Sequence, residues 1–260
     1  MIGRLLIIFF VLSSVANTFA QSPKSVEASL KRYLKEVSDY GNYGSRYNER
    51  RLNAANDKIR ALLLSGGRTA AILRYSFPKL KGDMYIATSP DGKFRIYSWD
   101  LETGGTMHDF ASVFQYQGKS GKVYTRAPID DEESAGSFYT QIFQTDSKRG
   151  PIYLANGNFI GSSSLNGQSI EAFAIEGEKF DAKPNVIRTS TGLTNSISFA
   201  YDFFSVVDHS ERPVRLVFYD PAKREFRFPV IIEDDDALQG RVTNKYIIYR
   251  FNNNVFVKVN

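Results

Sequence analysis

The stretch SPDGKFRIYSWD, residues 89–100, decides how the rest of the sequence is interpreted. Its Pro-Asp-Gly is a turn sequence, and the segment after it alternates like a β-strand. Successive strand residues point to opposite faces, so Phe94 and Ile96 lie on one face and Tyr97 and Trp99 on the other. Since both faces are apolar, we expect an interior strand that is covered on each side, with N-terminal helices as one cover.

Short segments rich in Phe, Tyr, Ile and Val continue from residue 82 to the end and alternate with turn sequences. Asn-Gly is the most specific of these turn signals, because a two-residue hairpin turn needs positive φ at both central positions. We expect an α+β protein that is mostly antiparallel β, with residues 82–260 forming a meander, a sandwich or a barrel. The six turn signals are residues 90–92, 118–121, 156–157, 166–167, 221–223 and 252–254.

The residues SPDGK at 89–93 resemble the hairpins of TolB-like propeller repeats. This resemblance implies a small β-propeller as an alternative architecture for residues 82–260. A propeller repeats its signature about every 40–50 residues, whereas here only YDPAKREFRF, residues 219–228, echoes it and lacks the Gly. The spacing therefore favours the meander, sandwich or barrel.

Two amphipathic helices are expected within residues 21–81. Apolar residues at spacings of three and four mark one helix in residues 22–40, where Ser22 suits the N-cap and Pro23 the first helical position. A second helix is expected from about residue 48 to residue 63, before the Ser-Gly-Gly of residues 65–67. The two helices form a helical hairpin ahead of the β region.

The same segment, residues 21–81, carries 13 Lys or Arg against 5 Asp or Glu, while the rest of the chain is mildly acidic. Such a distribution fits basic helices that dock on the β-sheets, and it also fits an anionic partner such as a lipid surface or a polymer.

Residues 1–20 have the pattern of a secretory signal peptide: Arg4, a short apolar run, and small residues before Gln21. We expect cleavage near Ala20, a periplasmic or extracellular location and no transmembrane segment in the mature chain. The sequence contains no Cys, which excludes disulfides, thiol catalysis and thiolate metal sites. Nucleic acid is not an expected partner outside the cytoplasm, and no cofactor is expected.

The sequence has two histidines, His108 and His209, and each is adjacent to an aspartate, Asp109 and Asp208. Neighbouring residues of an extended chain point to opposite faces, so neither local pair forms a catalytic dyad by itself. No G-x-S-x-G elbow accompanies them. We expect no catalytic residues; if the protein is an enzyme, these four are the residues to test.

Two acidic runs, residues 130–133 and 233–236, are possible calcium ligands. Neither has the alternating spacing of a calcium-binding loop, and consecutive acids on a turn are usually solvated. Two histidines are also too few for a three-histidine zinc site. We therefore expect no metal site.

The irregular segment WDLETGGTMHDFASVF, residues 99–114, is where we expect binding residues, because loops on rigid sheets often carry them. The candidate binding residues in this segment are Trp99, Gly104, Gly105, Met107 and His108. Aromatic residues such as Trp99, Tyr97, Tyr116 and Tyr139 also fit a sugar-stacking platform, although core packing explains them more simply.

These observations favour a non-enzymatic binding or interaction protein that recognises another protein or a cell-envelope component. The alternative is an envelope-polymer hydrolase that uses carboxylates or a His-Asp pair as acid and base. A deep cleft where a histidine and a carboxylate meet would favour the hydrolase.

Overall fold

The computed structural model describes residues 22–128 and 136–259. Helices α1 (Pro23–Tyr40), α2 (Glu49–Gly66) and α3 (Ala70–Arg74) come first, followed by the 3₁₀ helix η1 (Pro78–Leu80); a second 3₁₀ helix, η2 (Phe203–Val206), lies among the strands. The expected signal peptide and the acidic run 130–133 lie outside the described residues. The prediction of an α+β fold, with a helical hairpin before antiparallel sheets, is confirmed.

The described strands form three sheets. The helix-covered sheet has the order β1-β2-β3-β4, the central sheet β11-β7-β6-β5 with β8 beside β7, and the outer sheet β10-β9-β15-β14-β13-β12. All neighbouring strands are antiparallel except β9 and β15, which are parallel. The strands are β1 (Tyr85–Thr88), β2 (Phe94–Asp100), β3 (Phe110–Gln117), β4 (Val123–Arg126), β5 (Phe138–Ser147), β6 (Gly150–Ile160), β7 (Leu165–Glu176), β8 (Lys179–Asp181), β9 (Ile187–Thr189), β10 (Gly192–Thr194), β11 (Ser196–Asp202), β12 (Phe218–Asp220), β13 (Glu225–Ile232), β14 (Arg241–Asn252) and β15 (Val255–Lys258).

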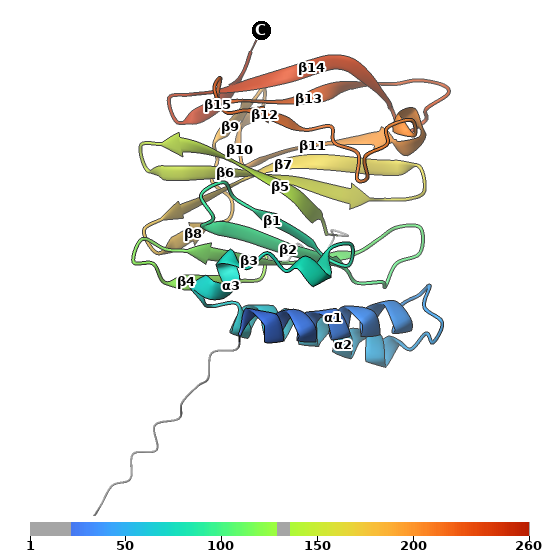
Figure 1. The fold of residues 1–260 in the computed structure, drawn as a ribbon. Helices are drawn as coiled ribbons and strands as arrows, with labels where there is room; N and C mark the ends of the chain where they lie inside the picture. Colours follow the sequence, from blue (N-terminus) through green and yellow to red (C-terminus); the bar gives the residue numbers. More distant parts are fainter. Residues whose placement is uncertain (1–21, 129–135, 260) are drawn as a thin grey trace, which may run out of the picture.

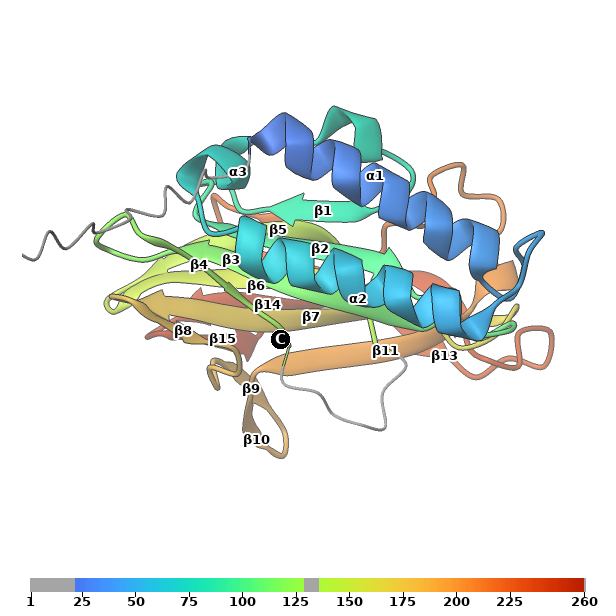
Figure 2. The same ribbon diagram turned by 90° about the horizontal axis from the view of Figure 1, so that it is seen from below.

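The helices and the three sheets are stacked as layers (Figure 1), and Figure 2 shows α1 and α2 lying across the helix-covered sheet. Apolar clusters fill the three interfaces: helices against the helix-covered sheet, that sheet against the central sheet, and the central sheet against the outer sheet, where a fourth, smaller cluster joins β11 to β13 and β14. The sheets do not surround a central axis, so the propeller alternative is wrong.

The strand β2 is buried on both faces, as its sequence predicts. Tyr97 and Trp99 pack in the cluster beneath the helices, while Phe94 and Ile96 pack against the central sheet. The indole N–H of Trp99 donates to Oδ1 of Asn56 at 2.9 Å, which ties β2 to α2. This one strand therefore belongs to two of the three apolar interfaces.

We expect Asn56→Ala to lower the free energy of unfolding by roughly 2 kcal/mol, because it leaves one buried and one partly buried group without the partner that Asn56 supplies. Those groups are the Trp99 indole N–H and the Leu101 carbonyl, which accepts from Nδ2 of Asn56 at 3.0 Å. Urea unfolding measures the loss, and Asn53→Ala, an exposed position on the same helix, is the matched control. Equal stability of the two variants would contradict this role.

The predicted helical stripes are confirmed, and Ser22 caps α1 by accepting from the Ser25 N–H. The helices dock on the sheet through these stripes, while basic residues such as Arg50 and Arg60 lie at the exposed surface. The buried stripe residues are Val26, Leu30, Leu34, Val37, Leu52, Ala55, Ile59 and Leu63.

Four of the six predicted turns join neighbouring antiparallel strands, but the two Asn-Gly turns are wrong. Asn156-Gly157 lies inside β6 and Asn166-Gly167 inside β7, and neither glycine has a positive φ. A Cβ at Gly157 would lie 2.4 Å from Oγ of Ser169 on the adjacent strand. Glycine is needed there because a neighbouring side chain crosses the strand, not because the chain turns.

Candidate functional site

A groove of about 1020 Å³ opens between α1, η1, β1 and the loop after β2. Apolar side chains form most of its lining, and its titratable and charged residues other than Tyr85 and Tyr139 are Lys81, Asp83, Asp100, Glu102, His108 and Arg212. The apolar lining includes Leu34, Val37, Phe77, Leu80, Met84, Ile86, Phe110 and Ile160.

His108 is held in this groove by Asp100, the last residue of β2. Nδ1 of His108 lies 2.5 Å from Oδ2 of Asp100, and the His108 side chain is 33 % exposed. The backbone N–H of Glu102 donates to the other Asp100 oxygen at 2.8 Å, and the His108 N–H donates to the Ile160 carbonyl at 3.1 Å. Asp100 therefore fixes the imidazole through Nδ1, and Nε2 has no hydrogen-bond partner among the described residues.

Two further titratable groups of the groove are perturbed. Burial raises the pKa of the Glu102 carboxyl, the negative charge of Asp100 raises it further, and His108 opposes the change. Burial also raises the pKa of the Tyr85 hydroxyl, again with a contribution from Asp100. Perturbed groups that share one charged neighbour are typical of functional sites and also occur in structural networks.

We expect carboxyl-carbon NMR to give Glu102 a pKa above its ordinary 4.5, and a lower value in Asp100→Asn, which removes the repelling charge. The folded state then binds this proton more tightly than the unfolded state does. Glu102 therefore favours folding at acid pH, and this contribution disappears as the pH rises through the folded-state pKa. A titration midpoint at or below 4.5 would contradict the burial of this carboxyl.

A second depression, of about 240 Å³, adjoins the first and shares Tyr85, Ile160, Arg212 and Pro213 with it. We call the two together the His108 groove. Asn166 lines the second depression, and its buried Oδ1 has no hydrogen-bond partner among the described residues. Aromatic side chains make up much of its wall: Tyr85, Phe138, Phe159, Tyr201 and Phe203.

Arg212 stands where the two depressions meet. Its guanidinium donates to the carbonyls of Val207 and Glu211, each at 2.9 Å, and to that of His209. It also lies 5.2 Å from the centre of the Phe203 ring. These contacts hold the positive charge of Arg212 at the groove. The guanidinium has no ion-pair partner among the described residues.

The predicted binding loop reaches the groove only in part. His108 lines it, and Met107 beside it is 50 % exposed. Asn42 secures the loop by donating to the Gly104 carbonyl at 2.8 Å, and Gly105 is exposed. Trp99 is fully buried in the core beneath the helices, so its side chain is not accessible to a ligand.

The other candidate side chains form no hydrogen bond or ion pair with His108 or Asp100 within the described residues. Asp109 accepts from the Thr103 hydroxyl at 2.9 Å, while Asp208 and His209 are exposed on the loop after η2. The acidic partner of His108 in the part of the chain that the structure describes is Asp100, eight residues earlier. Of the aromatic residues considered for a sugar platform, all four are core residues: Trp99, Tyr97, Tyr116 and Tyr139.

The sequence interpretation missed Asp100, Glu102, Tyr85 and Arg212. Asp100 and Glu102 had a local signal, since they are carboxylates within the irregular segment itself. Tyr85 and Arg212 had none, because only the packing of distant segments brings them to the loop.

In the second acidic run, Asp234 is paired with Arg241, Nε to Oδ2 at 2.6 Å. Within residues 22–128 and 136–259, no group of three or more His, Asp or Glu is arranged to hold a metal ion. In the same ranges, no helix has both the length and the apolar composition to cross a membrane.

No protein-family model, curated protein or solved structure matches this chain.

Proposed function

We propose that the protein is an exported binding protein that recognises another protein or a cell-envelope component through the His108 groove. The observation that carries this proposal is the size and lining of the groove. A depression of about 1020 Å³, with a second one beside it, is at or above the upper end for drug-sized ligands, which favours an extended ligand.

The groove combines the two features that a recognition surface needs. Its apolar lining supplies burial energy, and the hydrogen-bonded polar side chains of Asp100, His108 and Arg212 supply orientation. The Asp100–His108 pair and the Arg212 guanidinium are each held by hydrogen bonds before any ligand arrives, which reduces the ordering cost of binding.

Affinity purification of the mature protein from its own cell envelope, followed by mass spectrometry, tests this proposal. We expect Tyr85→Ala to reduce capture of a stoichiometric partner at least about tenfold, since Tyr85 lines both depressions. Tyr246→Ala on the outer sheet is the matched control, because these tyrosines are 38 % and 40 % exposed. Equal capture of the partner by the Tyr85→Ala and Tyr246→Ala variants would show that the partner does not bind in the His108 groove.

A second candidate function, hydrolysis of an envelope polymer, is favoured by the Asp100–His108 contact and the raised pKa of Glu102. In this scheme His108 Nε2 takes a proton from water as its oxygen attacks the ester or glycosidic carbon. Protonated Glu102 gives its proton to the departing oxygen, and solvent later carries the proton from His108 back to Glu102. Such acid and base assistance contributes roughly 10²- to 10⁴-fold in rate.

A panel of glycan and ester substrates tests the hydrolase. We expect His108→Gln to lower turnover by at least roughly 100-fold and His209→Gln, the other histidine of the chain, to leave it unchanged. Turnover that survives in His108→Gln would exclude His108 as the base, and no turnover on the panel would leave the binding function.

A further inference from the structure

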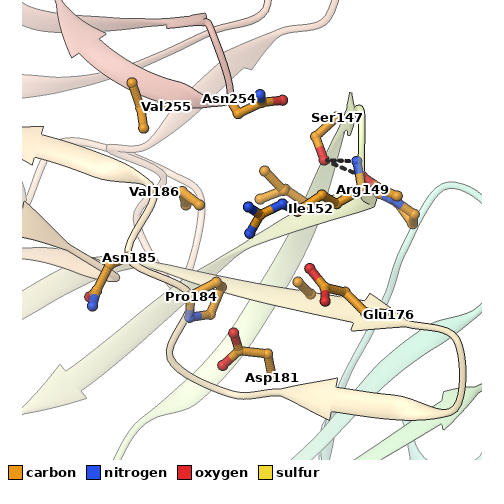
Figure 3. A pocket seen from close by; sticks show the side chains of 13 residues that line it. Ser147, Arg149, Ile152, Glu176, Asp181, Pro184, Asn185, Val186, Asn254 and Val255 are labelled. Atoms are coloured by element: carbon orange, nitrogen blue, oxygen red, sulfur yellow. Dashed lines mark hydrogen bonds between the residues drawn. The ribbon is translucent and has the colours of Figure 1, made fainter.

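A separate pocket of about 300 Å³, drawn in Figure 3, lies at the opposite end of β6 from the His108 groove. It includes Gly150, the first residue of β6, whereas the groove includes Ile160, the last. Ten residue steps along a strand span roughly 30 Å, so the two sites are independent. The turn between β5 and β6, the ends of β7 and β8, and the turn between β14 and β15 surround this pocket.

Opposite charges face each other across it. Arg149 lies on one side and Glu176 and Asp181 on the other (Figure 3). None of these side chains forms an ion pair within 4.0 Å among the residues that the structure describes. The pocket thus presents one guanidinium and two carboxylates to the same small volume, and none of the three has an ion-pair partner in residues 22–128 and 136–259.

The segments that carry these charges are anchored. Oγ of Ser147 accepts from the Arg149 N–H at 3.2 Å and donates to the Gly150 carbonyl at 2.7 Å, which fixes the turn. Asn254 ties that turn to the outer sheet by accepting from the Lys148 N–H at 3.3 Å. One oxygen of Asp181 accepts from the Lys183 N–H at 3.0 Å, so the carboxylate has a defined position.

The rest of the lining is largely apolar and comes from Pro151, Ile152, Ala174, Val186 and Val255. A volume at the lower end of ligand pockets suits a small molecule rather than a polymer. We propose that this pocket binds a small zwitterion with an apolar substituent, such as a free apolar amino acid. Its carboxylate pairs with Arg149, its ammonium group with Glu176 and Asp181, and its apolar group covers the floor.

Isothermal titration of the mature protein with leucine, N-acetyl-leucine and leucine amide tests this site. N-acetylation removes the positive charge and amidation the negative one, so we expect each derivative to bind at least about tenfold more weakly than leucine. Saturable leucine binding with this preference supports the proposal. No saturable binding of leucine, valine or methionine, or equal binding of the capped derivatives, would overturn it.

Substitutions in the pocket lining test whether leucine binds there. Arg149→Gln and Asp181→Asn are each expected to weaken leucine binding about tenfold or more, while Arg60→Gln, an exposed arginine on α2, leaves it unchanged. Leucine binding that persists in Arg149→Gln would overturn the assignment. Tyr85→Ala in the His108 groove should not affect leucine binding, so failure of the proposed function and failure of this site are distinguishable.

Discussion

Arg95→Met is expected to lower the free energy of unfolding by roughly 2–4 kcal/mol, because it leaves buried acceptors without a donor. Arg95 is 5 % exposed on β2 and donates to the carbonyls of Ile72 and Tyr75 at 3.1 and 2.7 Å. It also donates to the Thr88 hydroxyl at 2.8 Å. The guanidinium thereby joins α3 and the chain after it to the helix-covered sheet.

The guanidinium has no carboxylate partner among the described residues, and it lies 5.8 Å from the ring centres of both Phe77 and Tyr97. Met keeps much of the volume and loses every hydrogen bond. Lys93→Met, two residues earlier on the exposed side of the turn, removes the same charge and should change stability by no more than about 0.5 kcal/mol. Urea unfolding separates the two, and equal losses would show that net charge matters rather than these contacts.

Gly167→Ala is expected to lower the free energy of unfolding by about 2 kcal/mol, even though Ala normally favours an ordered chain over Gly. A Cβ at Gly167 would lie 2.1 Å from two ring atoms of Phe159 on β6 and 2.7 Å from the Phe199 carbonyl on β11. The ring can rotate away, but β11 is paired with β7 on both sides of this contact and cannot move alone.

Gly105→Ala is the matched control for this substitution. A Cβ there meets nothing within 4 Å, and its φ is not positive, so stability should stay the same or rise by up to about 1 kcal/mol. Thermal unfolding measures both variants. A neutral Gly167→Ala would contradict the close packing of β6, β7 and β11.

Patterns within one segment predicted much of the fold. The alternation in residues 94–99 predicted a strand buried on two faces, and the helical spacings predicted which residues of α1 and α2 are buried. The Asn-Gly turns failed because glycine also serves strands whose neighbours approach closely, and one sequence cannot show which neighbour that is. No prediction was made for Arg95, because only the position of α3 and the chain after it makes its guanidinium a buried donor.

The candidate site was less predictable for a similar reason. His108 was selected for the glycine-rich loop around it, and the partner that holds it is Asp100 across that loop rather than the adjacent Asp109. Arg212 and Tyr85 join it only through packing between distant segments. Sequence patterns identify a loop, whereas the composition of a groove depends on tertiary structure.

Photo-crosslinking from within the groove tests the central claim, that the His108 groove is the recognition surface. Benzoylphenylalanine at position 85 lines both depressions, and the same residue at position 246 reports on the outer sheet. After irradiation in the cell envelope, we expect one crosslinked partner from position 85 that is absent from position 246 and is lost with His108→Ala. The same partner crosslinked equally from both positions, or from position 246 alone, would contradict this account.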